Sequence, residues 1–243
     1  MAKRAAEDGF DISVATAPSN ARHRQLAFVV VIATLVAYAV MVPNATIPLP
    51  RIDSFLPTVL AIIFLADFVT AVLLYAQFSA TGLRPLQVLA SGYLFSSLIV
   101  VGFALIFPGA FAPTGLLGAG PQSAAWLNAF WRFGLAASIA GYAILRSGTQ
   151  TKNAVESAPR SAVSWSVAIV IVVVFTLTYA VTAGHEFLPP VIVDGKVLPI
   201  GRYANGVLAL TNLLALLLLL VLTRGRSILD LWLIVVVVEV RHG

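Results

Sequence analysis

The sequence predicts an all-α fold, a polytopic bundle of transmembrane helices with six full spans and a short or truncated seventh. Of its 243 residues, 60% are apolar and 10% are charged, and the mean hydropathy is +0.97. Soluble domains carry about 25% charged residues, and a helix needs about 20 apolar residues to cross a bilayer. Runs such as "LLALLLLLVL" and "VAIVIVVVF" lack the alternation of a membrane β-barrel strand. A lipid bilayer is therefore the first partner that the composition implies.

The apolar segments divide the chain into three regions. Residues 1–24 are polar and mixed in charge, which predicts a disordered cytoplasmic tail and not the basic start of a signal peptide. Residues 25–240 form the membrane-integral domain, and residues 241–243 form a short tail. We predict full spans at 25–42, 56–79, 85–107, 124–145, 161–184 and 204–223, and a short one at 227–240.

The last apolar segment meets Glu239 and Arg241 after about 14 residues, which is too short to cross the membrane comfortably. Either the seventh helix is a partial or tilted span, or the natural sequence continues beyond this chain.

The distribution of basic residues predicts the orientation, because short cytoplasmic loops are enriched in lysine and arginine. Ten of them fall on the side of the N-terminus, whereas the opposite side holds Arg51, Lys196 and Arg202. We therefore place the N-terminus in the cytoplasm. The loops on the other side are rich in proline or glycine, which favours compact turns that either cap an outward-facing pocket or simply connect helices.

Two ionisable residues lie deep within predicted spans. A charge near the bilayer centre costs about 2.5–3.5 kcal/mol on insertion scales, so such residues usually face the bundle interior and mark function. Asp67 and Arg132 lie at depths that agree to about one helical turn, so we expect them to form an ion pair, in either a functional or a purely structural role. Thr70 and Gln77 share a helix face with Asp67, at spacings of three and ten residues. Asn128 precedes Arg132 by four residues, and Trp131 lies beside it. The candidate ligand-binding or switch residues are Asp67, Thr70, Gln77, Asn128, Trp131 and Arg132.

The sequence argues against several other classes of protein. The chain has no cysteine, which excludes disulfides, thiolate ligands and iron–sulfur clusters. His23, His185 and His242 are too scattered to hold a metal or a haem. The sequence contains no nucleophile–base pattern, phosphate-binding loop or nucleic-acid motif. We therefore expect no enzyme activity, no metal, no cofactor and no nucleic-acid partner.

Four segments resemble the bacterial MASE4 integral-membrane sensory domain over about residues 24–238. They are "FLADFVTAVLLYAQF", "LQVLASGYLFSSLIVVGFALIFPGAF", "GPQSAAWLNAFWRFG" and "SILDLWLIVVV". The resemblance implies the input domain of a histidine kinase or diguanylate cyclase in the bacterial inner membrane, sensing a small ligand or the state of the membrane. It also implies a cytoplasmic signalling module in cis or a homodimer partner, with any catalytic activity in an output domain that this chain lacks.

This sequence departs from the family pattern at two places. Arg132 follows Trp131 where the family usually has a histidine, and a proline usual shortly afterwards is absent at "GLA". An arginine stays positively charged, whereas a histidine titrates near neutral pH, so the stimulus of other members need not be shared.

Two alternative functions remain open at the level of sequence. Central charges also occur in small transporters and channels, although the chain shows no inverted repeat and no matching pair of interrupted spans. The other alternative is a truncated, inactive remnant.

Overall fold

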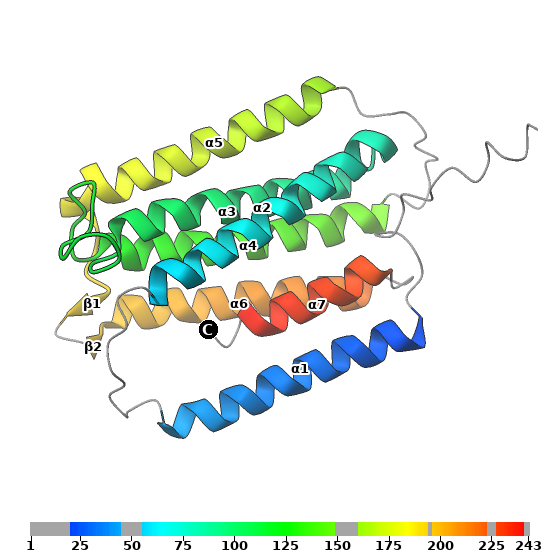
Figure 1. Cartoon of the computed structure of the whole chain (residues 1–243), viewed down its shortest axis with the longest axis horizontal. Coiled ribbons are helices and arrows are strands. Elements are labelled where there is room, and N and C mark those ends of the chain that lie inside the picture. The colour runs from blue at the N-terminus through cyan, green and yellow to red at the C-terminus, as the bar shows by residue number, and fades with distance from the viewer. Residues whose placement is uncertain (1–19, 45–54, 149–159, 194–195, 223–226, 241–243) are drawn as a thin grey trace, which may run out of the picture.

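The computed structural model describes residues 20–44, 55–148, 160–193, 196–222 and 227–240. Within these residues the chain forms seven α-helices, two 3₁₀ turns and one small hairpin (Figure 1). The α-helices are α1 (Ala21–Met41), α2 (Phe55–Thr81), α3 (Arg84–Ile106), α4 (Ser123–Gly148), α5 (Arg160–Ala183), α6 (Pro199–Leu222) and α7 (Ile228–Val240). The 3₁₀ turns are Val42–Asn44 and His185–Phe187, and strands β1 (Ile192–Val193) and β2 (Lys196–Val197) pair in antiparallel fashion.

The structure confirms the all-α class, and each predicted span contains a helix. Five helices, α1, α2, α3, α5 and α6, are long and apolar enough to cross a membrane, and α7 is a shorter apolar helix. The remaining helix, α4, has 26 residues but is less apolar than these five. The largest differences from the predicted boundaries are at the starts of two helices, since α1 begins at Ala21 and α6 at Pro199. Of the tails predicted at residues 1–24 and 241–243, residues 1–19 and 241–243 lie outside the described residues.

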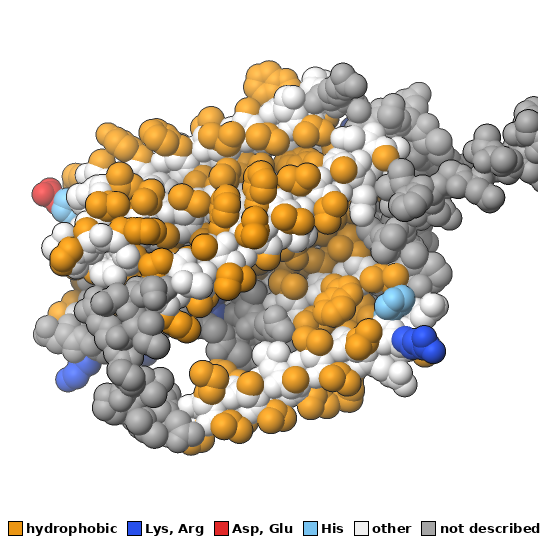
Figure 2. Space-filling view, viewed as in Figure 1, with side chains coloured by type: hydrophobic (Ala, Val, Ile, Leu, Met, Phe, Trp, Pro, Cys, Tyr) orange, Lys and Arg blue, Asp and Glu red, His pale blue; other side chains and the backbone are white. Residues whose placement is uncertain are grey.

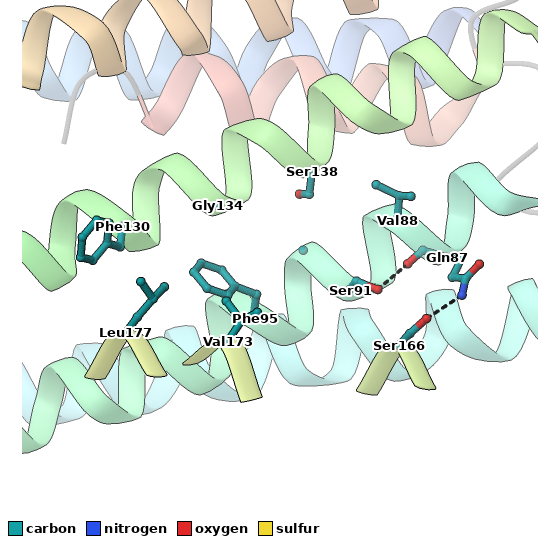
Figure 3. Close-up of a pocket in the computed structure, with 11 residues that line it drawn as sticks. Gln87, Val88, Ser91, Phe95, Phe130, Gly134, Ser138, Ser166, Val173 and Leu177 are labelled. Carbon is teal, nitrogen blue, oxygen red and sulfur yellow. Dashed lines mark hydrogen bonds between the residues drawn. The ribbon is translucent and has the colours of Figure 1, made fainter. Parts of the chain in front are cut away.

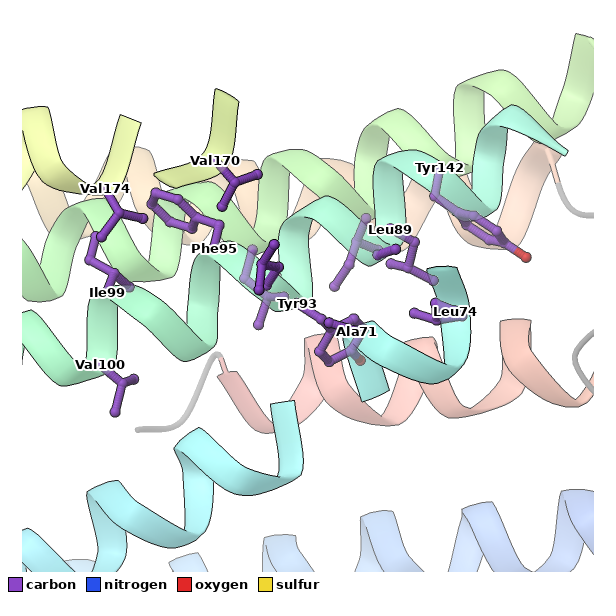
Figure 4. Packing of buried hydrophobic residues seen from close by; sticks show 14 of the residues in the cluster. Ala71, Leu74, Leu89, Tyr93, Phe95, Ile99, Val100, Tyr142, Val170 and Val174 are labelled. Carbon is purple, nitrogen blue, oxygen red and sulfur yellow. The ribbon is translucent and has the colours of Figure 1, made fainter. Parts of the chain in front are cut away.

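The third helix forms the centre of the bundle. α3 packs against α2, α4 and α5, and most of its residues are buried. Its Leu89 and Ile99 are completely inaccessible, and Figure 4 shows them among apolar side chains from neighbouring helices. Many large hydrophobic side chains on the outside of the bundle are exposed, and the most prominent charged side chains on the face in Figure 2 lie toward its two ends. This distribution fits helices surrounded by lipid on the outside.

Two glycines allow α3 and α4 to approach closely. A Cβ atom on Gly92 would lie 1.9 Å from Ser138 Oγ, and one on Gly134 would lie 2.1 Å from a ring carbon of Phe95. Small residues at helix contacts are typical of membrane bundles. They fix how α3 and α4 sit together, and so the geometry of the site between them.

The first helix stands apart from this core. In Figure 1, α1 lies beside α7, and a small cluster formed by Ala27, Leu231 and Val235 joins the two. Most of α1 is exposed. The bundle is therefore packed around α3, and α1 contacts it chiefly through α7.

The loop before α6 is held against the start of α4. Gln122 accepts hydrogen bonds from the backbone N–H groups of Val191 (2.8 Å) and Ile192 (3.1 Å), and it donates one to the Ile192 carbonyl (2.7 Å). Trp126 Nε1 donates to the Pro189 carbonyl at 3.0 Å. These bonds close one end of the space between α4 and α6.

Candidate functional site

Asp67 is the terminal acceptor of a hydrogen-bond chain that crosses three helices. Trp131 Nε1 on α4 donates to Ser96 Oγ on α3 at 2.6 Å, and Ser96 Oγ donates to Asp67 Oδ2 on α2 at 2.5 Å. An indole nitrogen can only donate, so Ser96 must accept from it and has its own proton left for Asp67. Ser96 is fully buried. The carboxylate of Asp67 is therefore stabilised by a directed polar chain inside the bundle.

The expected ion pair between Asp67 and Arg132 is wrong. Asp67 accepts a hydrogen bond from Ser96, whereas Arg132 lines a pocket next to α6. Successive residues on a helix point about 100° apart. Because Trp131 reaches toward α3, Arg132 is turned toward α6, although its depth matches that of Asp67.

The other two candidates on α2 do not join this chain in the described part of the structure. Thr70 Oγ1 donates to the carbonyl of Ala66 one turn earlier, at 2.7 Å. Gln77 Oε1 is buried and receives no hydrogen bond from the described residues. The helix spacing that suggested one shared polar face therefore places only Asp67 in the chain.

Asn128 and Arg132 do come together, as their spacing of four residues suggested. Both line a small pocket of about 50 Å³ between α4, α6 and the loop before α6. Gly201, Ala204 and Asn205 form its α6 side, and Val191 lies on the loop. The pocket has room for little more than a water-sized group.

A second polar cluster lies at the opposite end of α4, and sequence reasoning missed it. Asp230 on α7 is completely buried, and its Oδ2 lies 3.2 Å from Arg146 Nη2. Tyr142, also completely buried, donates its hydroxyl to Asp230 Oδ1 at 2.9 Å. Arg146 in turn hydrogen-bonds to the Tyr142 hydroxyl. Asp230 lies only about three residues from the start of the last predicted segment, which predicts a residue near the membrane interface with no special role. The structure instead places it at the centre of this cluster.

The start of α7 carries a local signal for this cluster in "SILD". The backbone N–H of Ser227 donates to Asp230 Oδ2 at 2.9 Å, and the backbone N–H of Asp230 lies 3.3 Å from Ser227 Oγ. This reciprocal arrangement resembles a capping box, which fixes an acidic side chain at the third position of a helix. The motif predicts the orientation of Asp230, but not its partner on α4.

Taken together, α4 connects the two clusters. Trp131 joins the Asp67 chain, and about three to four helical turns further along, Tyr142 and Arg146 hold α7. No group of three or more His, Cys, Asp or Glu side chains suited to a metal ion occurs among the described residues. The geometry thus defines a polytopic helical membrane protein whose buried polar groups link helices.

The comparison with protein families identifies the class. Residues 50–240 match MASE4, described as "Membrane-associated sensor, integral membrane domain". This chain belongs to the MASE4 family and is a membrane sensor domain whose ligand the match does not specify. The match begins after α1, so α1 lies outside it. No catalytic output domain was found in the chain, and the searches of curated proteins and of solved structures returned no match.

Proposed function

We propose that this chain is the sensory input domain of a bacterial signal-transduction protein, in which α4 moves between two arrangements and α7 transmits the change. The observation that carries the proposal is the double attachment of α4, to Asp67 through Trp131 and Ser96 and to α7 through Tyr142 and Arg146. A packed polar network has discrete arrangements, so a change at one attachment favours a change at the other.

The proposed topology has six full spans, which are the five long apolar helices and α4. The N-terminus is cytoplasmic, and the protein lies in the inner membrane. α4 is surrounded by α3, α5 and α6, so its polar side chains can face protein instead of lipid, which is where intramembrane polar residues are tolerated. With six spans the start of α7 is cytoplasmic, where it could act on a signalling module in cis or on the same helix of a homodimer partner.

The stimulus is proposed to act at the residues that α4 presents to its neighbours, chiefly Trp131, Asn128 and Arg132, together with Asp67. Either a small polar or anionic molecule beside Arg132 or a change in the membrane could shift α4. In both cases the stimulus must favour one arrangement over the other, because equal affinity for both would shift nothing. Thr70 and Gln77 remain weaker candidates, since neither joins the chain.

A reporter fusion tests this proposal. We would join a diguanylate cyclase module in frame after residue 243 and compare Trp131→Phe with Trp165→Phe, whose indole is 69% exposed on α5. Loss of a hydrogen bond worth about 0.5–1.5 kcal/mol should change the ratio of the two arrangements about two- to tenfold. Cyclase activity should therefore change with Trp131→Phe and not with Trp165→Phe. Equal activity in both variants, at equal membrane levels and helicity, would refute the proposed switch.

A further inference from the structure

A groove lies on α3 between α4 and α5, with a lining that differs from both polar clusters. It encloses about 640 Å³, within the range of about 300–1,000 Å³ typical of small-molecule sites. Figure 3 shows α4 side chains on one side, α5 side chains on the other, and α3 beneath. Val173, which lines it from α5, is 41% exposed. In a membrane this exposed side of the groove faces the acyl chains.

One end of the groove is polar but uncharged. Gln87 Nε2 donates to Ser166 Oγ at 2.5 Å and to the Ala162 carbonyl at 3.3 Å. Ser91 Oγ donates to the backbone carbonyl of Gln87 at 2.9 Å and lies 2.9 Å from the hydroxyl of Tyr75. These bonds fix which amide atom is the nitrogen, because a carbonyl oxygen such as that of Ala162 can only accept.

The amide oxygen of Gln87 is thereby left as an acceptor. It receives no hydrogen bond from any described residue, and Figure 3 shows it directed away from Ser166. A ligand that bonds to this oxygen must supply a donor, such as a hydroxyl group. None of the residues that line the groove is charged, so the site favours an uncharged headgroup over a phosphate or an ammonium group.

The rest of the groove is apolar and about as long as one membrane leaflet is thick. Phe95, Phe130 and Leu177 line it beyond the serines. From Ser166 to Leu177 the α5 wall extends about 16 Å at 1.5 Å per residue, which is close to half of a hydrocarbon core of about 30 Å. Gln87 lies only three residues from the exposed Arg84 at the start of α3, which places the polar end near a membrane surface.

We propose that this groove binds one acyl or alkyl chain of an uncharged, hydroxyl-bearing amphiphile, with its hydroxyl donating to Gln87 Oε1 and its chain lying along Phe95, Phe130 and Leu177. The source is either a glycerol lipid with a free hydroxyl or a long-chain alcohol dissolved in the membrane. This inference goes beyond the sensory role and does not depend on it, so a binding assay and a cyclase assay can fail separately.

Photolabelling of the full chain in liposomes tests the proposal. The probe is a monoacylglycerol with a diazirine in its acyl chain, and the labelled peptides are mapped by mass spectrometry. Val173→Trp should fill the groove and reduce labelling at least fivefold. Val172→Trp is the matched control, because it changes the neighbouring exposed valine of α5, which does not line the groove. Equal labelling of the two variants would overturn the site.

Competition tests the headgroup. Unlabelled monoacylglycerol and hexadecanol should each suppress labelling. Methyl oleate, which has no donor, should require about a tenfold higher concentration for the same suppression, as expected for a hydrogen bond of about 1 kcal/mol or slightly more. The stronger of the two hydroxyl competitors identifies the source. Gln87→Met should remove the preference for hydroxyl compounds while leaving the apolar groove in place. Equal competition by methyl oleate in the unmodified protein would overturn the proposed ligand class.

Discussion

Arg146 on α4 and Asp230 on α7 form an ion pair, and replacing one partner should reduce the stability of the bundle more than replacing the other. Arg146→Gln leaves the carboxylate of Asp230 buried without its counter-ion, whereas Asp230→Asn leaves a guanidinium whose side chain is already 24% exposed. An arginine near a helix end can extend its charged group toward water, and a completely buried carboxylate cannot. Breaking a buried pair typically costs about 3–5 kcal/mol. We expect about 3 kcal/mol for Arg146→Gln and about half of that for Asp230→Asn.

The assay is equilibrium unfolding by sodium dodecyl sulfate in mixed micelles, followed by far-ultraviolet circular dichroism. The double variant should be no less stable than Arg146→Gln alone, because residues in one network are not additive. Arg84→Gln, which changes an exposed arginine at the start of α3, is the control and should stay within about 0.5 kcal/mol of the parent. Additive effects, or a cost for Asp230→Asn equal to that for Arg146→Gln, would refute the reasoning.

Three further predictions follow from the packing and the proposed topology. Gly92→Ala should destabilise the bundle by about 1–3 kcal/mol in the same unfolding assay, and Ser138→Gly should restore part of that loss by removing the atoms that the new Cβ would meet; no recovery would contradict the direct contact. Gln122→Ala removes three hydrogen bonds to the loop before α6, so proteolysis of that loop should become severalfold faster than in the parent, and an unchanged rate would contradict its anchoring role. Because the chain has no cysteine, the single variants Ser147→Cys and Phe187→Cys can report topology. An impermeant maleimide should label the first only from the cytoplasmic side and the second only from outside. Labelling of both variants from the same side would exclude six spans.

The helices could be predicted from the sequence because length and hydropathy decide them almost alone. The exception is α4, whose Asn128 and Arg132 lower its hydropathy without shortening the helix. The helix was still predictable, because small residues such as Gly134 and Gly141 at spacings of three and four are typical of packed membrane helices. The small hairpin before α6 was not predicted, because its register depends on Gln122, which lies about 70 residues earlier.

The site was harder to predict, because depth in the membrane can be estimated from sequence while the direction of a side chain around the bundle cannot. Asp67 and Arg132 agree in depth but not in direction. Ser96 carried no signal of its own, since a serine in a helix often bonds only to its own backbone. Asp230 was placed near the interface by counting residues, and only the packing of α7 on α4 shows that it is buried.

α4 is less hydrophobic than the other predicted spans because its side chains contact several neighbouring helices. Trp131 reaches the Asp67 chain, Arg132 lines the pocket beside α6, Phe130 lines the groove beside α5, and Tyr142 holds α7. A helix that mostly faces lipid can carry no charged residue within its span, as α5 does after Arg160, but a helix with polar contacts on several sides must carry more polar residues. Any rotation of α4 would disturb all of these contacts at once, since residues 130, 131 and 132 are consecutive. In the proposed mechanism α4, and not the more hydrophobic α2 or α6, is therefore the helix that would transmit a stimulus in the membrane to α7.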